Sequence, residues 1–204
     1  MYSRKSIKHR GLCKECKKYQ QEIYTYKSCI VNDREITILL KEGCGIRSIS
    51  RILQISPTTT TSRILLISNR LKPSMIAMGK EYEVDELCTY IGNKGRKRWV
   101  AYALEKKTKK VVSFVVGTRT KKTLELVTKT LILSNATKIF TDKLNIYKSL
   151  IPPEIHTTKQ YSINHIERMN LTLRTHLKRL NRRTICYSKS ILMLVACLRI
   201  YFWG

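Results

Sequence analysis

Tyr82-Glu83-Val84-Asp85-Glu86-Leu87-Cys88-Thr89-Tyr90-Ile91-Gly92 is the stretch from which the architecture of this chain can be worked out. Its β-branched and aromatic residues predict a strand with a carboxylate pair in its middle. Acids are scarce in this chain, which has 40 Lys and Arg but three Asp. Asp142 closes a second apolar run, and Glu167 follows 25 residues later in a segment of helical period. Because an acid at the end of a buried strand needs a cation or a metal as partner, Asp85, Asp142 and Glu167 suggest a divalent-metal site that acts on phosphate.

Composition indicates a folded protein that binds a polyanion. The chain has 204 residues, 43% of them hydrophobic, and a formal net charge of +26. Residues 1–70 contain 14 basic and 5 acidic residues, and the remainder contains 26 and 9. Both regions should therefore face a polyanion, and nucleic acid is the favoured one. A membrane surface is the alternative, but no segment has a strong amphipathic basic face with anchoring aromatic residues.

The same composition predicts a protein of a reducing compartment, and the family resemblance described below implies a cytoplasmic, nucleoid-associated one. The longest apolar run, residues 191–198, is too short to span a bilayer. The first 15 residues have no apolar core of the kind that a secretory signal contains. Seven cysteines at irregular spacing predict a reducing compartment rather than a disulfide framework.

The first 30 residues resemble a truncated zinc ribbon. Cys13 and Cys16 form one CxxC pair, which supplies half of a tetrahedral zinc site. Cys29 and Cys44 are candidate further ligands, but neither belongs to a second pair. We therefore favour two ordinary reduced cysteines in a turn, and a bound zinc ion is doubtful.

Residues 31–70 are predicted to form a helix-turn-helix domain of three short helices. Asp33 is a candidate N-cap of the first helix, and Gly43-Cys44-Gly45 should end it. Ser56 and Pro57 begin the last helix, whose N-terminal residues would face the major groove of DNA. The candidate DNA contacts there are Thr58, Thr59, Thr60 and Arg63. A plain three-helix core is the alternative.

The remaining chain reads as an α/β domain, residues 81–204, after a linker at 71–80. Strands at 82–91, 98–104 and 111–117 should form an antiparallel meander with turns at 92–95 and 106–110. A helix within 118–134, with Thr120 as candidate cap, leads to a short strand at 138–142 that is parallel to the first. Further predictions are a short helix within 143–151, a fifth strand at 154–158, and helices at 163–180 and 187–203.

This order makes the strand of Asp85 and the strand of Asp142 neighbours, so the three acids can converge although they are 57 and 25 residues apart. Such acids can hold two Mg²⁺ or Mn²⁺ ions that activate an attacking oxygen and stabilise the leaving one. The structural alternative is that Asp85 and Glu86 pair with Lys and Arg, and that Glu167 pairs with Arg174 on the helix surface.

An ordered set of motifs resembles the insertion-sequence-one (InsAB-type) family of DDE transposases over nearly the whole chain. The matching motifs are Asp85-Glu86, Tyr90-Ile91-Gly92, Lys94, Arg98-Trp99, Gly117-Thr118-Arg119-Thr120, Thr141-Asp142, Ile166-Glu167-Arg168, Asn170, Leu173-Arg174, Arg179-Leu180, Arg182-Arg183-Thr184 and Ser188-Lys189-Ser190. Cys88 departs from the family pattern, which often has a bulky aromatic residue there. The resemblance implies a ribonuclease-H-like mixed sheet with packed helices and an Asp-Asp-Glu triad carried by Asp85, Asp142 and Glu167.

The implied activity is transposition of a bacterial insertion sequence. Metal-dependent hydrolysis at the element ends would free a 3′-hydroxyl, which would then attack target DNA. The implied partners are the terminal inverted repeats, target DNA and further copies of this chain, as a homo-oligomer on DNA. Arg119, Arg168 and Arg174 are candidate phosphate contacts, and His165 is either a further one or a surface histidine with satisfied hydrogen bonds. The alternatives are an inactive remnant that acts as a DNA-binding repressor, and a nucleoid protein that binds by charge alone.

Purified protein is expected to carry well under one zinc ion per chain, because Cys13 and Cys16 lack a second pair. Elemental analysis of the purified chain measures this directly. Stoichiometric zinc that is lost in Cys13→Ser would contradict the expectation and would indicate Cys29 or Cys44 as a further ligand.

Overall fold

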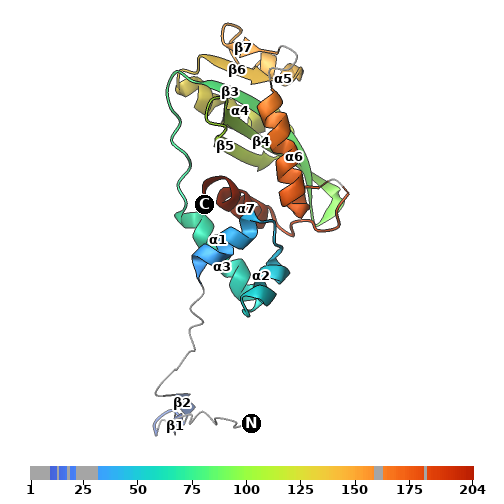
Figure 1. Cartoon of the computed structure of the whole chain (residues 1–204). Coiled ribbons are helices and arrows are strands. Elements are labelled where there is room, and N and C mark those ends of the chain that lie inside the picture. The colour runs from blue at the N-terminus through green and yellow to red at the C-terminus, as the bar shows by residue number, and fades with distance from the viewer. Residues whose placement is uncertain (1–9, 13, 18, 22–31, 159–162, 182) are drawn as a thin grey trace. The chain divides into compact units, whose positions relative to one another are not determined.

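The computed structural model describes residues 10–12, 14–17, 19–21, 32–158, 163–181 and 183–204 (Figure 1). The chain divides into two units, residues 1–31 and residues 32–204. In the first unit, β1 (Arg10–Leu12) pairs antiparallel with β2 (Tyr19–Gln21). Cys13 and Cys29, two of the candidate zinc ligands, lie outside the described residues.

The second unit begins with the three predicted helices, α1 (Asp33–Lys41), α2 (Ile46–Ile52) and α3 (Pro57–Arg70). The cap of α1 is Asn32 rather than Asp33, since the Asn32 side chain accepts a hydrogen bond from the backbone N–H of Arg34. Ser56 caps α3 as predicted, accepting from the backbone N–H of Thr59 at 2.9 Å, with Pro57 at the first helical position.

Gly43 ends α1 in the left-handed conformation, with φ +81°. A Cβ atom at this position would stand 2.2 Å from the backbone oxygen of His176, in the C-terminal half of the chain. The position therefore needs glycine both for its backbone conformation and for this close approach.

A five-stranded mixed sheet follows, in the order β5-β4-β3-β6-β7. The strands are β3 (Glu81–Ile91), β4 (Asn93–Glu105), β5 (Val111–Gly117), β6 (Lys138–Thr141) and β7 (His156–Thr157). The first three are antiparallel, and β6 is parallel to β3 and to β7. The meander and the parallel pairing of the first and fourth strands are thus confirmed.

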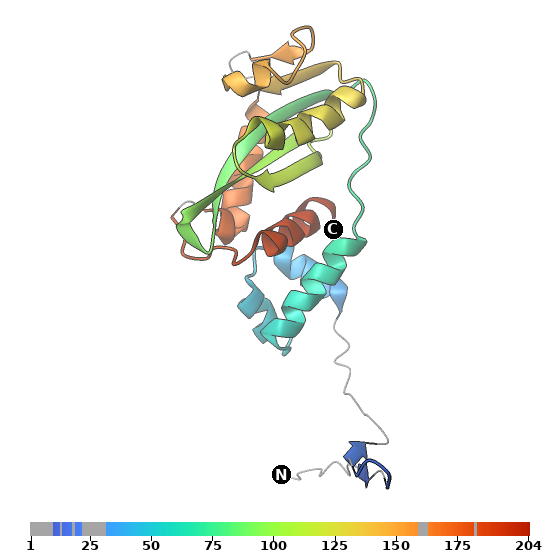
Figure 2. The ribbon, with the colours of Figure 1, turned by 180° about the vertical axis from the view of Figure 1, so that it is seen from behind.

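Helices pack on both faces of the sheet. They are α4 (Lys121–Leu133), α5 (Asn145–Lys148), α6 (Asn164–His176), the 3₁₀ turn η1 (Lys178–Leu180) and α7 (Ile191–Trp203). One core contains α4 residues Leu124, Val127 and Leu131 against the sheet, and the other contains residues of α6, η1 and α7. Figures 1 and 2 show α4 and α6 on opposite faces. No described helix is long and apolar enough to cross a membrane.

The C-terminal helix α7 packs against α1 and α3 as well as against β5. The indole Nε1–H of Trp203 donates to the backbone oxygen of Val111 at 2.9 Å. The helices of residues 32–70 and the sheet therefore belong to one compact unit that α7 helps to join.

Two elements differ from the sequence prediction. β4 begins at Asn93, so the turn consists of Gly92 alone rather than of residues 92–95. Gly92 has φ +75°, and the register of the two strands shifts between Tyr90 and Ile91. The helix expected over 163–180 ends at His176, and Leu177 leads into η1. Leu177 and Leu180 are both buried in the core, so packing interrupts a helix that the apolar period alone would continue.

Gly43→Ala should lower the free energy of unfolding by at least about 2 kcal/mol, because alanine is strained at positive φ and its methyl group would overlap the backbone of His176. Gly45→Ala is the matched control, since a Cβ atom there meets nothing within 4 Å. Denaturant unfolding of both variants measures the difference. Equal stabilities would contradict the close approach between α1 and the end of α6.

Candidate active site

The register between β3 and β6 brings Asp85 and Asp142 together. Val84 is paired with Thr141, so Asp85 and Asp142 occupy the next position on each strand. In a parallel pair both strands run in the same direction, so the residues that follow the last paired position lie side by side, Asp85 within the continuing strand β3 and Asp142 just after the end of β6. The four residue pairs between β3 and β6 therefore place Asp85 beside Asp142, as the sequence predicts.

Three carboxylates meet where β6 ends beside β3. Asp85, Glu86 and Asp142 each offer an oxygen atom, and these atoms lie within 4.8 Å of one another. The Glu86 side chain is 1% exposed and the Asp142 side chain 34%. Glu86 is therefore closed off from solvent, whereas Asp142 opens to it.

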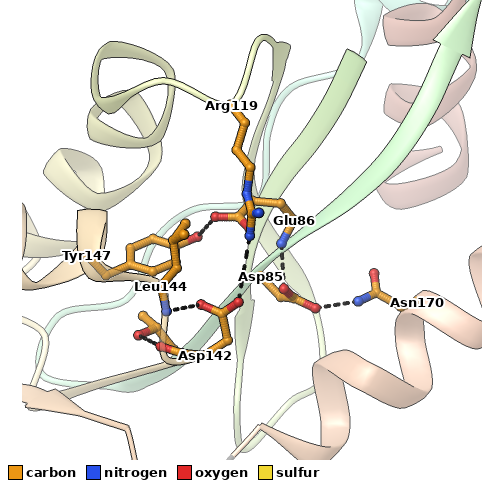
Figure 3. A network of polar contacts seen from close by, with 8 residues as sticks. Asp85, Glu86, Arg119, Asp142, Leu144, Tyr147 and Asn170 are labelled. Carbon is orange, nitrogen blue, oxygen red and sulfur yellow. Dashed lines mark hydrogen bonds and ion pairs between the residues drawn. The ribbon is translucent and has the colours of Figure 1, made fainter. Parts of the chain in front are cut away.

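Glu86 is held by two donors from different elements (Figure 3). The hydroxyl of Tyr147, on α5, donates to Oε1 at 2.6 Å, and the Arg119 guanidinium donates to Oε2 at 3.0 Å. Tyr147 is fully buried, and its pKa is raised by burial and by the charge of Glu86. Glu86 thus orders α5 and Arg119 around the cluster.

Arg119 also faces Asp142, with 3.9 Å between the guanidinium and Oδ2. Its guanidinium lies 4.6 Å from the ring centroid of Trp99. The other Asp142 oxygen accepts from the backbone N–H of Leu144 at 3.0 Å. A cation stacked on an aromatic ring and aimed at two carboxylates offsets part of their mutual repulsion.

Asp85 faces the opposite side of the cluster, toward α6. Its Oδ1 accepts from the backbone N–H of Glu86 at 2.7 Å, and its Oδ2 accepts from the Asn170 amide at 2.6 Å. Asn170 is fixed in turn by the buried hydroxyl of Tyr102, which donates to its Oδ1 at 2.8 Å. The pKa of Asp85 is raised to about 6, chiefly by burial and also by the charges of Glu86 and Asp142, while the two hydrogen bonds oppose the rise.

Glu167 lies on α6 but outside this cluster. Its side chain is exposed, and the group of three acids found among the described residues does not include it. It precedes Asn170 by three residues, so the two share one side of the helix. Next to it, the backbone N–H of Ile166 donates to the fully buried carboxylate of Glu83 at 2.8 Å. The helical turn that carries Glu167 is thus attached directly to β3.

Comparisons with known proteins agree with the motif resemblance. The sequence model of the IS1 transposase family matches residues 80–201. This chain belongs to the IS1 transposase family. The insertion element iso-IS1n protein InsB of Shigella dysenteriae is 38% identical over 109 residues, which are 53% of this chain and 83% of that protein.

Other relatives of this IS1 transposase give the same result. The IS1 protein InsB of Shigella flexneri has the same identity and coverage, and the IS1 4 protein InsB of Escherichia coli K12 is 38% identical over 65% of its length. A solved simian T-cell lymphotropic virus intasome in complex with a PP2A regulatory subunit is similar in part. It has a TM-score of 0.41 and 16% identity, over 80% of this chain and 66% of the viral complex chain.

The residues predicted to contact DNA lie in several places. Thr58 and Thr59 are exposed at the start of α3, but Thr60 is fully buried and its hydroxyl is 2.8 Å from the Ser50 hydroxyl. Thr60 is therefore not available to DNA, and its role here is to join α2 to α3. Arg63 is half-buried and forms an ion pair with Asp33 at 3.6 Å.

The arginines of the transposase domain differ in position. Arg119 belongs to the acid cluster, which the sequence did not predict. On α6, Arg168 is exposed and Arg174 is half-buried.

Sequence reasoning did not assign Glu86, Tyr147 or Asn170 to the site. The position of Glu86 next to Asp85 in the sequence is the feature that could have placed it in the site. Asn170 had a weaker signal, its spacing of three residues from Glu167. Tyr147 had none, because its hydroxyl reaches a carboxylate 61 residues earlier in the chain.

Carboxylates in such proximity fit a hard divalent cation. Oxygen ligands from acids suit Mg²⁺ or Mn²⁺, and the three acids here offer carboxylate oxygens. The members of the site that could hold such an ion directly are Asp85 and Asp142, because the Glu86 side chain is 1% exposed and is already paired with Arg119.

Ionisation of Asp85 should destabilise the metal-free protein as the pH rises. The pKa of Asp85 is raised from 3.8 to about 6 in the folded state, so its contribution to stability is fully present below pH 3.8 and is lost as the pH rises through 6. Asp85→Asn has no such loss. Its stability relative to the unsubstituted protein should therefore improve by about 1–3 kcal/mol between acidic and neutral pH.

Thermal or denaturant unfolding at several pH values in a chelating buffer measures this difference. The exposed acid Glu154 provides the control, since Glu154→Gln should leave the pH dependence unchanged. A stability difference between Asp85→Asn and the unsubstituted protein that does not vary with pH would contradict the raised pKa.

Proposed function

We propose that this chain cleaves the phosphodiester bond at the ends of its own insertion element and joins the freed 3′-hydroxyl to target DNA. The observation that carries the proposal is the pair formed by Asp85 and Asp142 where β6 ends beside β3, in a chain with so few acids. We further propose that the five-stranded mixed sheet is a ribonuclease-H-like fold, with which its strand arrangement is consistent.

In this proposal Asp85 and Asp142 bind one or two Mg²⁺ or Mn²⁺ ions, and Glu167 completes the coordination. Such ions supply Lewis acidity and neutralise charge on the phosphate when bound. The position of α6 supports the role of Glu167, because Asn170, one helical turn later, already touches Asp85. Three residues correspond to about 4.5 Å along a helix axis, a distance that a glutamate side chain can cover.

Arg119 provides a positive charge beside Glu86 and Asp142. It is held at 3.0 Å from Glu86 and stacked on Trp99, so its direction is fixed before the substrate arrives. A guanidinium can donate two hydrogen bonds to a phosphate. We assign Arg119 to the scissile phosphate and Glu86 to the positioning of Arg119.

Recognition of the element ends is assigned to the helices of residues 32–70. Thr58 and Thr59 are exposed at the N-terminus of α3, where a helix-turn-helix protein presents side chains to the major groove. Arg63 lies one turn further along α3, and Arg168 and Arg174 on α6 are candidate phosphate contacts. We propose that cleavage takes place in a homo-oligomer on the DNA.

Asp142→Asn should reduce cleavage and strand transfer by orders of magnitude while leaving the protein as stable as before or slightly more so. The reason is that the variant removes repulsion among three close carboxylates but also removes a metal ligand. Glu167→Gln should have the same effect on activity with little change in stability, because the side chain is exposed. The measurements are the rate of end cleavage with Mg²⁺ and the melting temperature on the same preparations.

Glu154→Gln is the matched control, since Glu154 is an exposed acid outside the cluster, and it should cleave at the original rate. A destabilised Asp142→Asn protein whose folded fraction still cuts DNA would overturn the triad. An unsubstituted protein that protects the terminal repeats but cuts nothing would favour the DNA-binding repressor instead.

A further inference from the structure

Beyond the sheet, β3 and β4 continue as a two-stranded ribbon. The pairing of β4 with β5 ends at Trp99 and Gly117, and the pairing of β3 with β6 ends at Val84 and Thr141. β3 and β4 remain paired with each other as far as Ile91 and Asn93, with a register shift after Tyr90 and Lys97. Figures 1 and 2 show this pale green end extending past the other strands.

The end of the ribbon is fastened to the segment that precedes α7. The backbone N–H of Gly92 donates to the oxygen of Ser188 at 2.9 Å, and the Thr89 hydroxyl donates to the oxygen of Arg179 at 3.2 Å. The rings of Tyr90 and Tyr187 meet edge to face, with 5.8 Å between their centroids. The ribbon is therefore a braced element rather than a free hairpin.

Both segments that meet here contain basic residues and no acidic ones. Residues 87–104 contain four Lys and Arg without an Asp or Glu, and residues 168–204 contain eight without an Asp or Glu. Lys94, Arg96 and Lys97 are exposed, and within the described part of the chain none of them forms an ion pair with a carboxylate. Cations gathered without counter-charges repel one another, and a polyanion relieves that repulsion.

We propose that the ribbon, with Lys94, Arg96 and Lys97 on it, is a second DNA-binding surface that grips the sugar-phosphate backbone of duplex DNA next to the cleavage site. A two-stranded β-ribbon fits against the grooves of B-DNA, and cations along it contact phosphates rather than bases. This surface is separate from α3 and from the acid cluster, and it fixes the direction in which the duplex leaves the cluster.

The register of the strands predicts where the contact falls. Lys97 is paired with Tyr90, five residues from Asp85 along β3, and Asn93, next to Lys94, is paired with Ile91, six residues from Asp85. At about 3.3 Å per residue, these cations stand roughly 17–20 Å from the acids. That length corresponds to about 5–6 base pairs of duplex at about 3.4 Å each. The predicted position of this contact on the DNA rests on the proposed cleavage function, whereas the DNA-binding surface itself does not.

The first test measures how DNA affinity depends on salt, in the presence of a chelator so that no cleavage occurs. The full-length variant Lys94→Ala/Arg96→Ala/Lys97→Ala is compared with the unsubstituted protein on a duplex that carries the element's end. Loss of three phosphate contacts should lower the log–log slope by roughly 2–3. The three side chains are exposed, so the melting temperature should stay unchanged.

The matched control is Lys107→Ala/Lys110→Ala/Lys129→Ala, which removes the same charge from exposed positions on the β4–β5 turn and α4. Its slope should fall by less than about 1, because these residues lie away from the proposed DNA path. Equal slopes for the ribbon variant and the unsubstituted protein would overturn the proposal. So would an equal loss in the control, since net charge alone would then explain binding.

The second test locates the contact by replacing single phosphates of the duplex with uncharged methylphosphonates. Binding of the unsubstituted protein should weaken at positions about 5–6 base pairs from the element boundary, and the ribbon variant should be insensitive there. Sensitivity that persists in the variant would overturn the assignment. A ribbon-dependent slope in a protein that cuts no DNA would support this surface while contradicting the proposed cleavage.

Discussion

Parallel pairing between β3 and β6 is the constraint on which the candidate site depends. The pair spans four residues on each strand, and it ends where Asp85 and Asp142 begin. A slip of one residue would turn one of these acids toward the other face of the sheet, because side chains alternate along a strand. Helix α4 crosses between β5 and β6 and buries Leu124, Val127 and Leu131 in the same core as Val84 of β3 and Ile139 of β6. Its hydrophobic contacts therefore help to hold in place the two strands beside which the acids lie.

The three acids of the cluster differ in what surrounds them. Glu86 is buried and receives hydrogen bonds on both oxygens, so its charge is used within the protein. Asp142 is the most exposed of the three, and its contact with Arg119 is long, at 3.9 Å. Asp85 is intermediate, with a pKa of about 6 that reflects its burial beside two other acids. Arg119 thus offsets the charge of Glu86, and Tyr147 donates a hydrogen bond to it. These contacts help to keep three acids close together.

Helix α6 is attached to β3 at two levels on either side of Glu167. The buried carboxylate of Glu83 accepts from the backbone of Ile166, and Asp85 accepts from the amide of Asn170. Tyr102 extends the second contact to β4 through its hydroxyl. Glu83 and Asp85 of β3 therefore fix the position of α6, and Asp85 also belongs to the acid cluster. The position of Glu167 is thus tied to the same strand that carries Asp85.

The sequence by itself determined the order and nature of the main elements. Alternating apolar residues indicated the strands, Ser56 and Pro57 marked the start of α3, and the scarcity of acids singled out Asp85 and Asp142. These signals are local, since they depend on residues within one or two turns or strand repeats of each other. Tertiary structure alone decided that Thr60 is buried, that α6 stops at His176, and that Arg119 and Tyr147 converge on Glu86. Each of those outcomes depends on contacts between segments distant in the chain, and the period of a single segment contains no information about which partner will cover it.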